Sequence, residues 1–275
     1  MTTTDFKRLS SFIHKECGIK MPAEKKIMLE YRLKRRLSIL KIASYGEYCD
    51  FLFSKEGMQN ELVHMIDAVT TNKTDFFRES PHFDFLTQYA LPELCNGSGA
   101  DKELKIWSAA CSSGEEVYTL ATVINEYVEM TGNVKYHILG TDISTRILAA
   151  SIAAVYAEDR ITGIPAILKR KYFMKSKDRT NKTVRVVPEI RGKTHFKRVN
   201  LMDDNYDVRN DYDIIFCRNV LIYFDRVTQE SVINKLSTKL KPGGFLFLGH
   251  SESVSNMQIP LTQVRPTILK KISNQ

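Results

Sequence analysis

The sequence predicts an α/β protein with a Rossmann-like, mostly parallel sheet and helices on both faces. From residue 104 onward, short apolar runs typical of strands alternate with helical segments, which is the pattern of a parallel sheet. The stretch IWSAACSSGEEVYTLA (106–121) begins as a buried strand, turns through small residues and continues as a helix, as nucleotide-binding α/β units do. The segment KPGG (241–244) is a typical stop between a helix and the next strand.

The individual elements follow from apolar periodicity and from the turn signals between them. Strands are expected at 104–109, 136–141, 195–200, 212–217, 244–249 and 267–272. Helices are expected at 115–129, 144–155 and 226–240. Ligands of such sheets bind beyond the carboxyl ends of the strands, so the residues that directly follow each strand are the candidates for a site.

Between about 172 and 196 the pattern changes to short extended runs, YFM, VRVV and THF, separated by polar turns. This change favours a small antiparallel β subdomain inserted into the α/β domain. The segment 169–198 is strongly basic, with twelve Lys or Arg against two acids. A solvated hairpin without a partner would also explain that composition.

The first part of the chain is predicted to form an all-helical domain at 1–70, followed by a linker that covers the site at 71–98 and by the α/β domain at 99–275. Leucines recur there at the spacing of one helix face: Leu29, Leu33, Leu37 and Leu40. Basic residues fall on another face of the same segment: Lys25, Arg32, Arg35 and Arg36.

The net charge of +8 is unevenly distributed over the 275 residues. Residues 1–41 carry +7 and residues 169–198 carry +10, which leaves −9 on the remainder. Two basic regions on an otherwise acidic chain favour an anionic partner, such as nucleic acid, membrane lipid or an acidic protein. Basic residues that only keep the surface solvated would explain either run alone.

The composition also restricts the class of protein. The sequence contains no apolar run of about 18 residues, and its start, MTTTDFKRLSS, is unlike a signal peptide. Its five cysteines lack the spacing of metal ligands, so we expect no metal site. We therefore expect a soluble, cytoplasmic protein with free thiols.

Acidic residues follow the predicted strands, in the place where phosphate-binding folds have glycines. The first turn has one glycine, Gly114, followed at once by Glu115 and Glu116. Asp142 ends the second strand, where an acid typically binds ribose hydroxyls. A ligand with a ribose, no phosphate and a positive charge would fit, and S-adenosylmethionine has a ribose, an ammonium and a sulfonium. One glutamate would bind the ammonium, and the other would favour the positive end of the helix.

Helix capping is the alternative explanation for each acid taken alone. A glutamate at a helix start more often stabilises the helix dipole than it binds a ligand, and Asp142, followed by Ile143 and Ser144, could itself be a helix cap. The ordered set is more specific, because capping does not explain why the features of a phosphate loop are missing.

Four long blocks with many polar residues follow one another along the chain: TTNKTDFFRESPHF (70–83), WSAACSSGEEVYTLA (107–121), FCRNVLIYFD (216–225) and LKPGGFLFLGHSES (240–253). Together they resemble the chemotaxis receptor methyltransferases of the CheR type, and the resemblance covers nearly the whole chain. The departures are mild, since Ser113, Val117 and Thr119 stand where that family is expected to have Thr, Pro and Ser. None of them removes a charged contact residue.

The resemblance implies a class I methyltransferase that transfers the methyl group of S-adenosylmethionine to glutamates of membrane chemoreceptors, leaving S-adenosylhomocysteine. The implied partners are the cytoplasmic domains of methyl-accepting chemotaxis receptors, with recruitment to receptor arrays. No nucleic acid, metal or membrane insertion is expected, and the enzyme is expected to be a monomer. The family's β subdomain can bind a receptor's C-terminal peptide, but the loop KSKDRTNKT here has no glycine, so tethering stays open.

The resemblance also assigns positions in this chain. The residues implied at the cofactor are Asn72, Thr74, Arg78, Glu116, Asp142, Asn200, Leu201, Arg218 and Asn219. Glu116 would hold the methionine part and Asp142 the ribose. Asn200 and Leu201 would contact the adenine end, and Tyr223 would lie near the methyl group.

The chemistry of the implied reaction needs positioning more than acid–base catalysis. Methyl transfer from a sulfonium is an in-line displacement, with donor and acceptor about 3–3.5 Å apart. A glutamate with a pKa of about 4.3 is already an anion at neutral pH, so no general base is required. We assign Arg78 to steering the incoming carboxylate and Tyr223 to orienting the reacting groups. The basic face formed by Lys25, Arg32, Arg35 and Arg36 would dock the acidic receptor helix.

A nucleic-acid methyltransferase with the same cofactor is the alternative, because it too would combine cofactor-binding acids with basic surfaces. Base N-methylation usually places an Asn/Asp-Pro-Pro-aromatic turn after the fourth strand, and residues 218–221 read RNVL instead. Base C5 methylation needs an activated thiolate, whereas Cys217 lies in an apolar strand. A non-catalytic adaptor is a third possibility, and the presence of every candidate cofactor residue counts against it.

Overall fold

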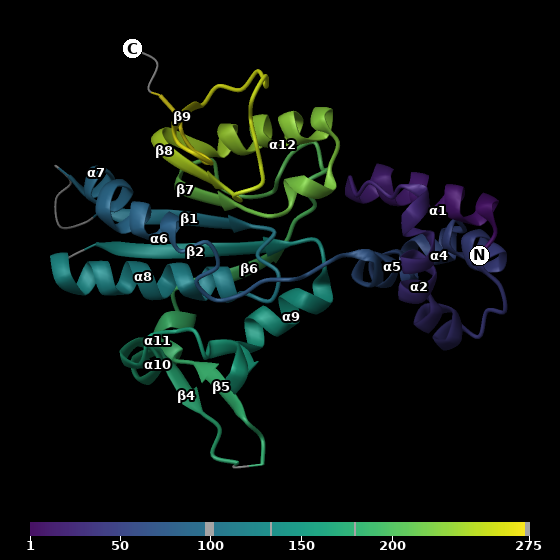
Figure 1. Ribbon diagram of the computed structural model, residues 1–275, viewed down its shortest axis with the longest axis horizontal. Helices are drawn as coiled ribbons and strands as arrows, with labels where there is room; N and C mark the ends of the chain where they lie inside the picture. Colours follow the sequence, from purple (N-terminus) through teal and green to yellow (C-terminus); the bar gives the residue numbers. More distant parts are fainter. Residues whose placement is uncertain (97–101, 133, 179, 273–275) are drawn as a thin grey trace.

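A seven-stranded sheet of order β6-β2-β1-β7-β8-β10-β9 forms the centre of the structure, a computed structural model that describes residues 1–96, 102–132, 134–178 and 180–272. The strands are β1 (Glu103–Ala109), β2 (Lys135–Asp142), β6 (Thr194–Arg198), β7 (Tyr212–Cys217), β8 (Leu240–Leu248), β9 (Thr262–Arg265) and β10 (Ile268–Lys270). Neighbours from β6 to β8 pair in parallel, and β10 pairs antiparallel with β8 and β9 (Figure 1). The predicted fold class is confirmed.

Helices cover both faces of this sheet, because successive strand residues point to opposite sides. Ile106 of β1 packs in the core beneath α8 (Glu115–Thr131), whereas its neighbour Trp107 packs in the core beneath α12 (Arg226–Lys239). Figure 1 shows α8 and α12 on opposite sides of the sheet. Outside the inserted subdomain, the other helical turns in the described part of this domain are α6 (Pro81–Phe85), η2 (Leu86–Ala90), α7 (Leu91–Cys95), α9 (Thr145–Ala153) and η4 (Leu221–Tyr223).

The N-terminal helices form a separate bundle at one end of the molecule (Figure 1). They are α1 (Thr3–Cys17), η1 (Ala23–Lys25), α2 (Lys26–Leu40), α3 (Tyr45–Leu52), α4 (Lys55–Asn60) and α5 (Leu62–Val69). Leu29, Leu33 and Leu37 are buried in a core of their own with residues of α1, α3 and α5. The all-helical N-terminal part is confirmed. Among the residues described, no helix combines the length and apolar character needed to cross a membrane.

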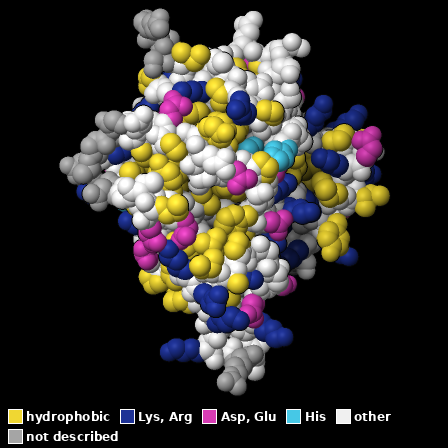
Figure 2. All heavy atoms as spheres, turned by 60° about the vertical axis from the view of Figure 1, so that its left-hand side comes forward, with side chains coloured by type: hydrophobic (Ala, Val, Ile, Leu, Met, Phe, Trp, Pro, Cys, Tyr) yellow, Lys and Arg dark blue, Asp and Glu magenta, His cyan; other side chains and the backbone are white. Residues whose placement is uncertain are grey.

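The inserted sheet starts earlier in the chain than the sequence suggested. Its strands are β3 (Val155–Ala157), β5 (Thr183–Val186) and β4 (Phe173–Lys175), paired antiparallel in that order, and η3 (Glu158–Ile161), α10 (Ala166–Tyr172) and α11 (Pro188–Arg191) accompany them. Residues 194–196, expected both in the insertion and, from 195, in a main-sheet strand, belong to β6 of the main sheet. β3 has three residues, too few for an alternating pattern to reveal it. Figure 2 shows basic side chains gathered on this protruding lower end.

Polar contacts hold the helical bundle across the carboxyl edge of the sheet. Asp67 of α5 accepts hydrogen bonds from the hydroxyls of Ser144 (2.6 Å) and Thr145 (3.2 Å) at the start of α9. Beyond α1, the Lys20 N–H donates to the Tyr223 carbonyl at 2.9 Å. The bundle is therefore bonded to the α/β domain on two sides of the strand ends. The expected boundary between 98 and 99 lies in 97–101, outside the described residues.

Gly114, which precedes α8, lies in the turn after β1, and its substitution tests how closely that turn packs against α9. Its φ is +94°, and a Cβ there would lie 2.8 Å from the Ser151 Cβ. Gly132 also has a positive φ, +78°, but its ψ is 154° and a Cβ there would meet open space. We expect Gly132→Ala to lower the free energy of unfolding by about 1–3 kcal/mol from backbone strain alone, because nearly only glycine adopts that conformation. Gly114→Ala should lose about 1–2 kcal/mol from its left-handed backbone and roughly a further 1–3 kcal/mol because the added methyl overpacks the site.

Urea unfolding of the two variants beside the unsubstituted protein measures this difference. A loss of no more than about 2 kcal/mol for Gly114→Ala, the cost of its left-handed backbone alone, would show that close packing against α9 does not constrain the turn.

Candidate active site

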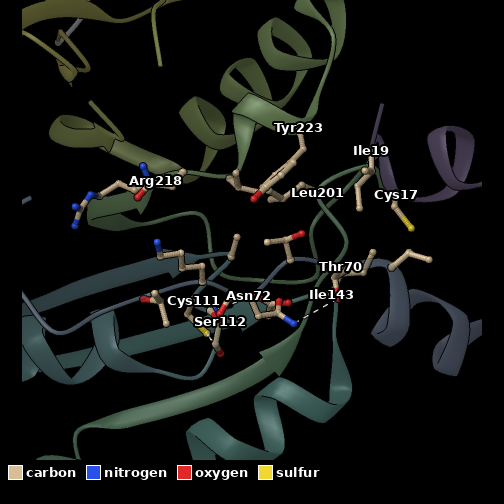
Figure 3. Close-up of a pocket in the computed structure, with 18 of the residues that line it drawn as sticks. Cys17, Ile19, Thr70, Asn72, Cys111, Ser112, Ile143, Leu201, Arg218 and Tyr223 are labelled. Atoms are coloured by element: carbon tan, nitrogen blue, oxygen red, sulfur yellow. Dashed lines mark hydrogen bonds between the residues drawn. The ribbon is translucent and has the colours of Figure 1, made fainter. Parts of the chain in front are cut away.

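A pocket lies at the carboxyl ends of β1, β2, β6 and β7, where the helical bundle covers the sheet (Figure 3). This is the edge at which the order of strands reverses, with β2 and β6 on one side of β1 and β7 and β8 on the other. All the residues assigned to catalysis or cofactor binding line it: Asn72, Thr74, Arg78, Glu116, Asp142, Asn200, Leu201, Arg218, Asn219 and Tyr223. Cys17 and Ile19, from the helical bundle, complete the wall.

Asp142 is held at the end of β2 by backbone N–H groups. Its two carboxylate oxygens accept from the Ser112 N–H at 2.9 Å and from the Ser144 N–H at 3.0 Å. Burial raises the pKa of Asp142, and these N–H groups oppose that rise. Ser112 is brought there by a turn in which it and Ala110 both have positive φ, 52° and 60°. A carboxylate has about four acceptor positions, so Asp142 retains capacity for ligand hydroxyls.

Glu116, in the first turn of α8, is held by Ser108 and Arg218. Its Oε1 accepts from the Ser108 hydroxyl at 2.7 Å, and its Oε2 accepts from Arg218 Nη1 at 3.2 Å. Burial raises the pKa of Glu116, and the Arg218 charge is the main opposing influence. Because Glu116 lines the pocket, it offers a fixed carboxylate to a cationic ligand.

Glu115 is adjacent in sequence but has a different environment. It is 1% exposed and accepts from Arg160 Nη2 at 2.7 Å and from the Ser113 hydroxyl at 2.6 Å. Arg160 also donates to the Thr74 carbonyl at 2.5 Å. Of these two glutamates, Glu116 therefore lines the pocket, and Glu115 forms an ion pair with Arg160 of the inserted subdomain.

The segment 70–80, here called the strap, crosses the turn after β1. The Ser112 hydroxyl donates to the Asn72 carbonyl at 3.0 Å, and the Phe77 N–H donates to the Thr119 hydroxyl at 3.2 Å. Within the strap, Arg78 Nη1 donates to the Lys73 carbonyl at 3.0 Å. These bonds keep the strap over the pocket.

The opposite wall comes from the segments that follow β6 and β7. Figure 3 shows Tyr223 on the other side of the pocket from Asn72. The side-chain amide of Asn200 donates to the Glu16 carbonyl at 2.7 Å, and its Oδ1 accepts from the Met202 N–H at 3.0 Å. The side chain of Asn200 thus joins the two domains.

Two glutamates that the sequence analysis did not single out support the β7 end. Glu252 accepts from the N–H groups of Val220 (2.9 Å) and Leu221 (2.8 Å). Glu79, in the strap, accepts from Arg218 Nη2 at 2.9 Å and from the Asn219 amide at 3.0 Å. Both glutamates lie inside the blocks FFRES and GHSES, and only their three-dimensional partners distinguish them from other acids.

Glu79, His82 and His250 form a group whose potential metal-ligand atoms all lie within 4.8 Å of one another. The Glu79 Oε2 atom already accepts from Arg218 and, at 3.2 Å, from the His250 N–H. A metal ion there would also face the Arg218 guanidinium, which repels it. The group therefore fits a metal ion poorly.

The four basic residues predicted to dock a receptor do not share one free surface. Lys25 and Arg32 line the pocket, and Arg32 also donates to the Thr71 hydroxyl at 2.8 Å. Arg36 pairs through two nitrogens, at 2.8 and 2.5 Å, with Glu61, which is 1% exposed. Arg35 is exposed. The predicted face is wrong for Arg36, because its charge is already neutralised inside the bundle.

This fold, with acids after its first two central strands, is that of an S-adenosylmethionine-dependent methyltransferase. Residues 72–269 match the family described as CheR methyltransferase, SAM binding domain, and residues 4–70 match CheR methyltransferase, all-alpha domain. The chain belongs to the CheR methyltransferase family, as the resemblance predicted.

Named relatives match over most of their length. The chain is 38% identical to a chemotaxis protein methyltransferase of Borreliella burgdorferi, over 98% of this chain and 95% of that one. It is 37% identical to chemotaxis protein methyltransferase 2 of Pseudomonas aeruginosa, over 92% and 87%. Identity to the chemotaxis protein methyltransferase of Salmonella typhimurium is 35%, over 94% and 86%.

Proposed function

We propose that the protein transfers the methyl group of S-adenosylmethionine to glutamate side chains in the cytoplasmic domains of membrane chemoreceptors. The family and the name of the relatives, chemotaxis protein methyltransferase, support this function. The observation that carries it is the pocket itself, which presents the acids Glu116 and Asp142 beneath a strap that contributes Arg78. Recruitment to receptor arrays and action as a monomer are part of the proposal.

The arrangement of the two acids suits the cofactor. β1 and β2 are neighbours in the sheet, so Glu116 and Asp142 offer adjacent sites for an ammonium and a ribose. Asn200 and Leu201, after β6, would contact the adenine end, while Arg218 and Asn219 line the floor. Asn72 and Thr74 would cover the cofactor from the strap.

The reaction needs no residue to remove a proton. A carboxylate oxygen of the receptor glutamate forms a bond to the methyl carbon as the carbon–sulfur bond breaks, and sulfur keeps the electron pair. The products are a methyl ester and the neutral thioether S-adenosylhomocysteine. Arg78 would attract the incoming anion into a pocket whose acids repel it, and Tyr223 would orient the reacting groups.

The nucleic-acid methyltransferase is not favoured. Cys217 is fully buried, and burial raises its pKa well above the ordinary value, so it is not an activated thiolate. The turn after β7 holds Asn219 by hydrogen bonds from its side chain to Glu79 and from its N–H to Glu252. The names of the relatives, chemotaxis protein methyltransferases, favour a protein substrate instead.

Incubation with methyl-labelled S-adenosylmethionine and either receptor-containing membranes or RNA tests the function. We expect label on the receptors that is released by mild alkali, because carboxyl methyl esters hydrolyse readily. Label in RNA, with none on receptors, would overturn the proposal.

Arg78→Ala separates catalysis from cofactor binding. We expect kcat on receptor substrate to fall about 10- to 100-fold, because the acceptor carboxylate loses its positioning charge, while cofactor affinity changes only a few-fold. Calorimetry with S-adenosylhomocysteine and steady-state kinetics measure the two effects. Arg265→Ala, at an exposed position on β9, is the matched control. Unchanged kcat in Arg78→Ala would remove Arg78 from the reaction.

Two neighbouring arginines of α2 allow a role in receptor docking to be distinguished from a role in stability. Arg35→Glu should raise KM for the receptor several-fold at low salt, and the effect should fade near 1 M salt, where charges are screened beyond about 3 Å. Arg36→Ala should instead destabilise the protein by about 3–5 kcal/mol, because it leaves the buried Glu61 with a hydrogen bond from Tyr48 but without a cation. Receptor kinetics and urea unfolding of both variants measure the two effects. An increase in KM for Arg35→Glu that does not depend on salt would contradict electrostatic docking.

A further inference from the structure

The Arg218 guanidinium lies in the floor of the pocket, with its side chain 2% exposed. It stands over the rings of Phe83 and Phe216, at 5.6 and 5.8 Å from their centres. A buried guanidinium is stable only where carboxylates share its charge. Among the described residues, its recorded carboxylate partners are Glu116, at 3.2 Å, and Glu79, at 2.9 Å.

Glu79 differs from Glu116 in its position. Within the described part of the chain, the pocket wall includes Glu116, Arg218 and Asn219 but not Glu79. The Oε2 atom of Glu79 accepts from Nε and Nη2 of Arg218, at 3.3 and 2.9 Å, and from the His250 N–H. Burial opposes ionisation of Glu79, but Asn219 and Arg218 outweigh it and lower the pKa to about 2. Glu79 is therefore charged at neutral pH.

Glu79 and Asn219, whose side chains are hydrogen-bonded to each other, both have a strained backbone conformation. Glu79 and Asn219 both have φ of 58°, a left-handed conformation that costs energy for residues other than glycine. The two side chains bond to each other at 3.0 Å. Such strain persists where the surroundings hold it, and it gathers at functional sites.

The histidines beside Glu79 do not take over the role of Arg218. His82 Nδ1 lies 3.6 Å from the Glu79 carboxylate, and burial together with Arg218 lowers the pKa of His82 to about 4. His82 is therefore neutral at pH 7. His250 Nε2 lies at 4.0 Å and its side chain is half exposed. Glu79 therefore forms its main ion pair with Arg218.

We propose that Glu79 is a positioning residue for the amino-acid part of the cofactor. By sharing the charge of Arg218, it leaves Glu116 free to bind the ammonium group. Without the charge of Glu79, Arg218 would pair more strongly with Glu116, and its unbalanced charge would repel the ammonium. This inference rests on the proposed function, because it assumes that Glu116 faces an ammonium.

Two ligands that differ in the amino-acid part test the proposal. S-adenosylhomocysteine carries the aminobutyrate group, whereas 5′-methylthioadenosine has the same adenine, ribose and sulfur without it. For Glu79→Gln in the full chain, calorimetry should show affinity for S-adenosylhomocysteine lower by about tenfold or more. Affinity for 5′-methylthioadenosine should change less than about twofold. Glu79→Asp, which keeps the charge, should recover part of the loss.

Glu56→Gln, at an exposed position on α4, is the matched control. Equal weakening of both ligands by Glu79→Gln would show a merely structural role and overturn the proposal, as would unchanged or tighter binding of S-adenosylhomocysteine. If Glu79→Gln does not fold, Glu79→Asp is measured instead. Weaker binding of S-adenosylhomocysteine than of 5′-methylthioadenosine, each relative to the unsubstituted protein, would then support the proposal, and equal weakening would overturn it. Failure of the unsubstituted protein to bind either ligand would contradict the proposed function itself.

Discussion

The pairing of charges buried where the strands end is the constraint on which the pocket depends. The Arg218 guanidinium is almost fully buried, and such a charge is stable only when carboxylates surround it. Glu79 approaches it from the strap and Glu116 from the first turn of α8. Because the turn after β7, the strap and α8 each contribute one group, these ion pairs also determine how the three segments lie relative to one another. Any ligand cation bound by Glu116 therefore joins an arrangement of charges that already exists.

The helical bundle is part of the pocket wall rather than an appendage. Asn200 reaches from the α/β domain to the Glu16 carbonyl, and Asp67 reaches back from α5 to Ser144 at the start of α9. Ser144 also donates its N–H to Asp142, so the bundle contacts the acid assigned to the ribose through one intermediate residue. A ligand in this pocket would contact both domains, so its binding would stabilise their association by mass action.

Short sequence patterns predicted most of the strands and helices. The features that were missed depend on contacts between residues far apart in the chain. β7 was predicted to the residue because five of its six positions, all but Asp213, are apolar or aromatic. Every residue assigned to the cofactor lines the pocket, because the ends of parallel strands meet at one edge. The basic face of α2 failed at Arg36, since helical spacing cannot reveal Glu61, 25 residues away. Glu79 and Arg160 went unnoticed for the same reason.

The adjacent acids at the start of α8 show how one turn serves two purposes. Consecutive helix residues point about 100° apart, so Glu115 and Glu116 cannot face the same group. Glu116 faces the pocket and Arg218, while Glu115 pairs with Arg160, which also donates to the Thr74 carbonyl of the strap. The first acid thus anchors the strap through the inserted subdomain, and the second supplies the charge beneath it. A phosphate loop could do neither, because its glycines carry no side chain to pair with an arginine.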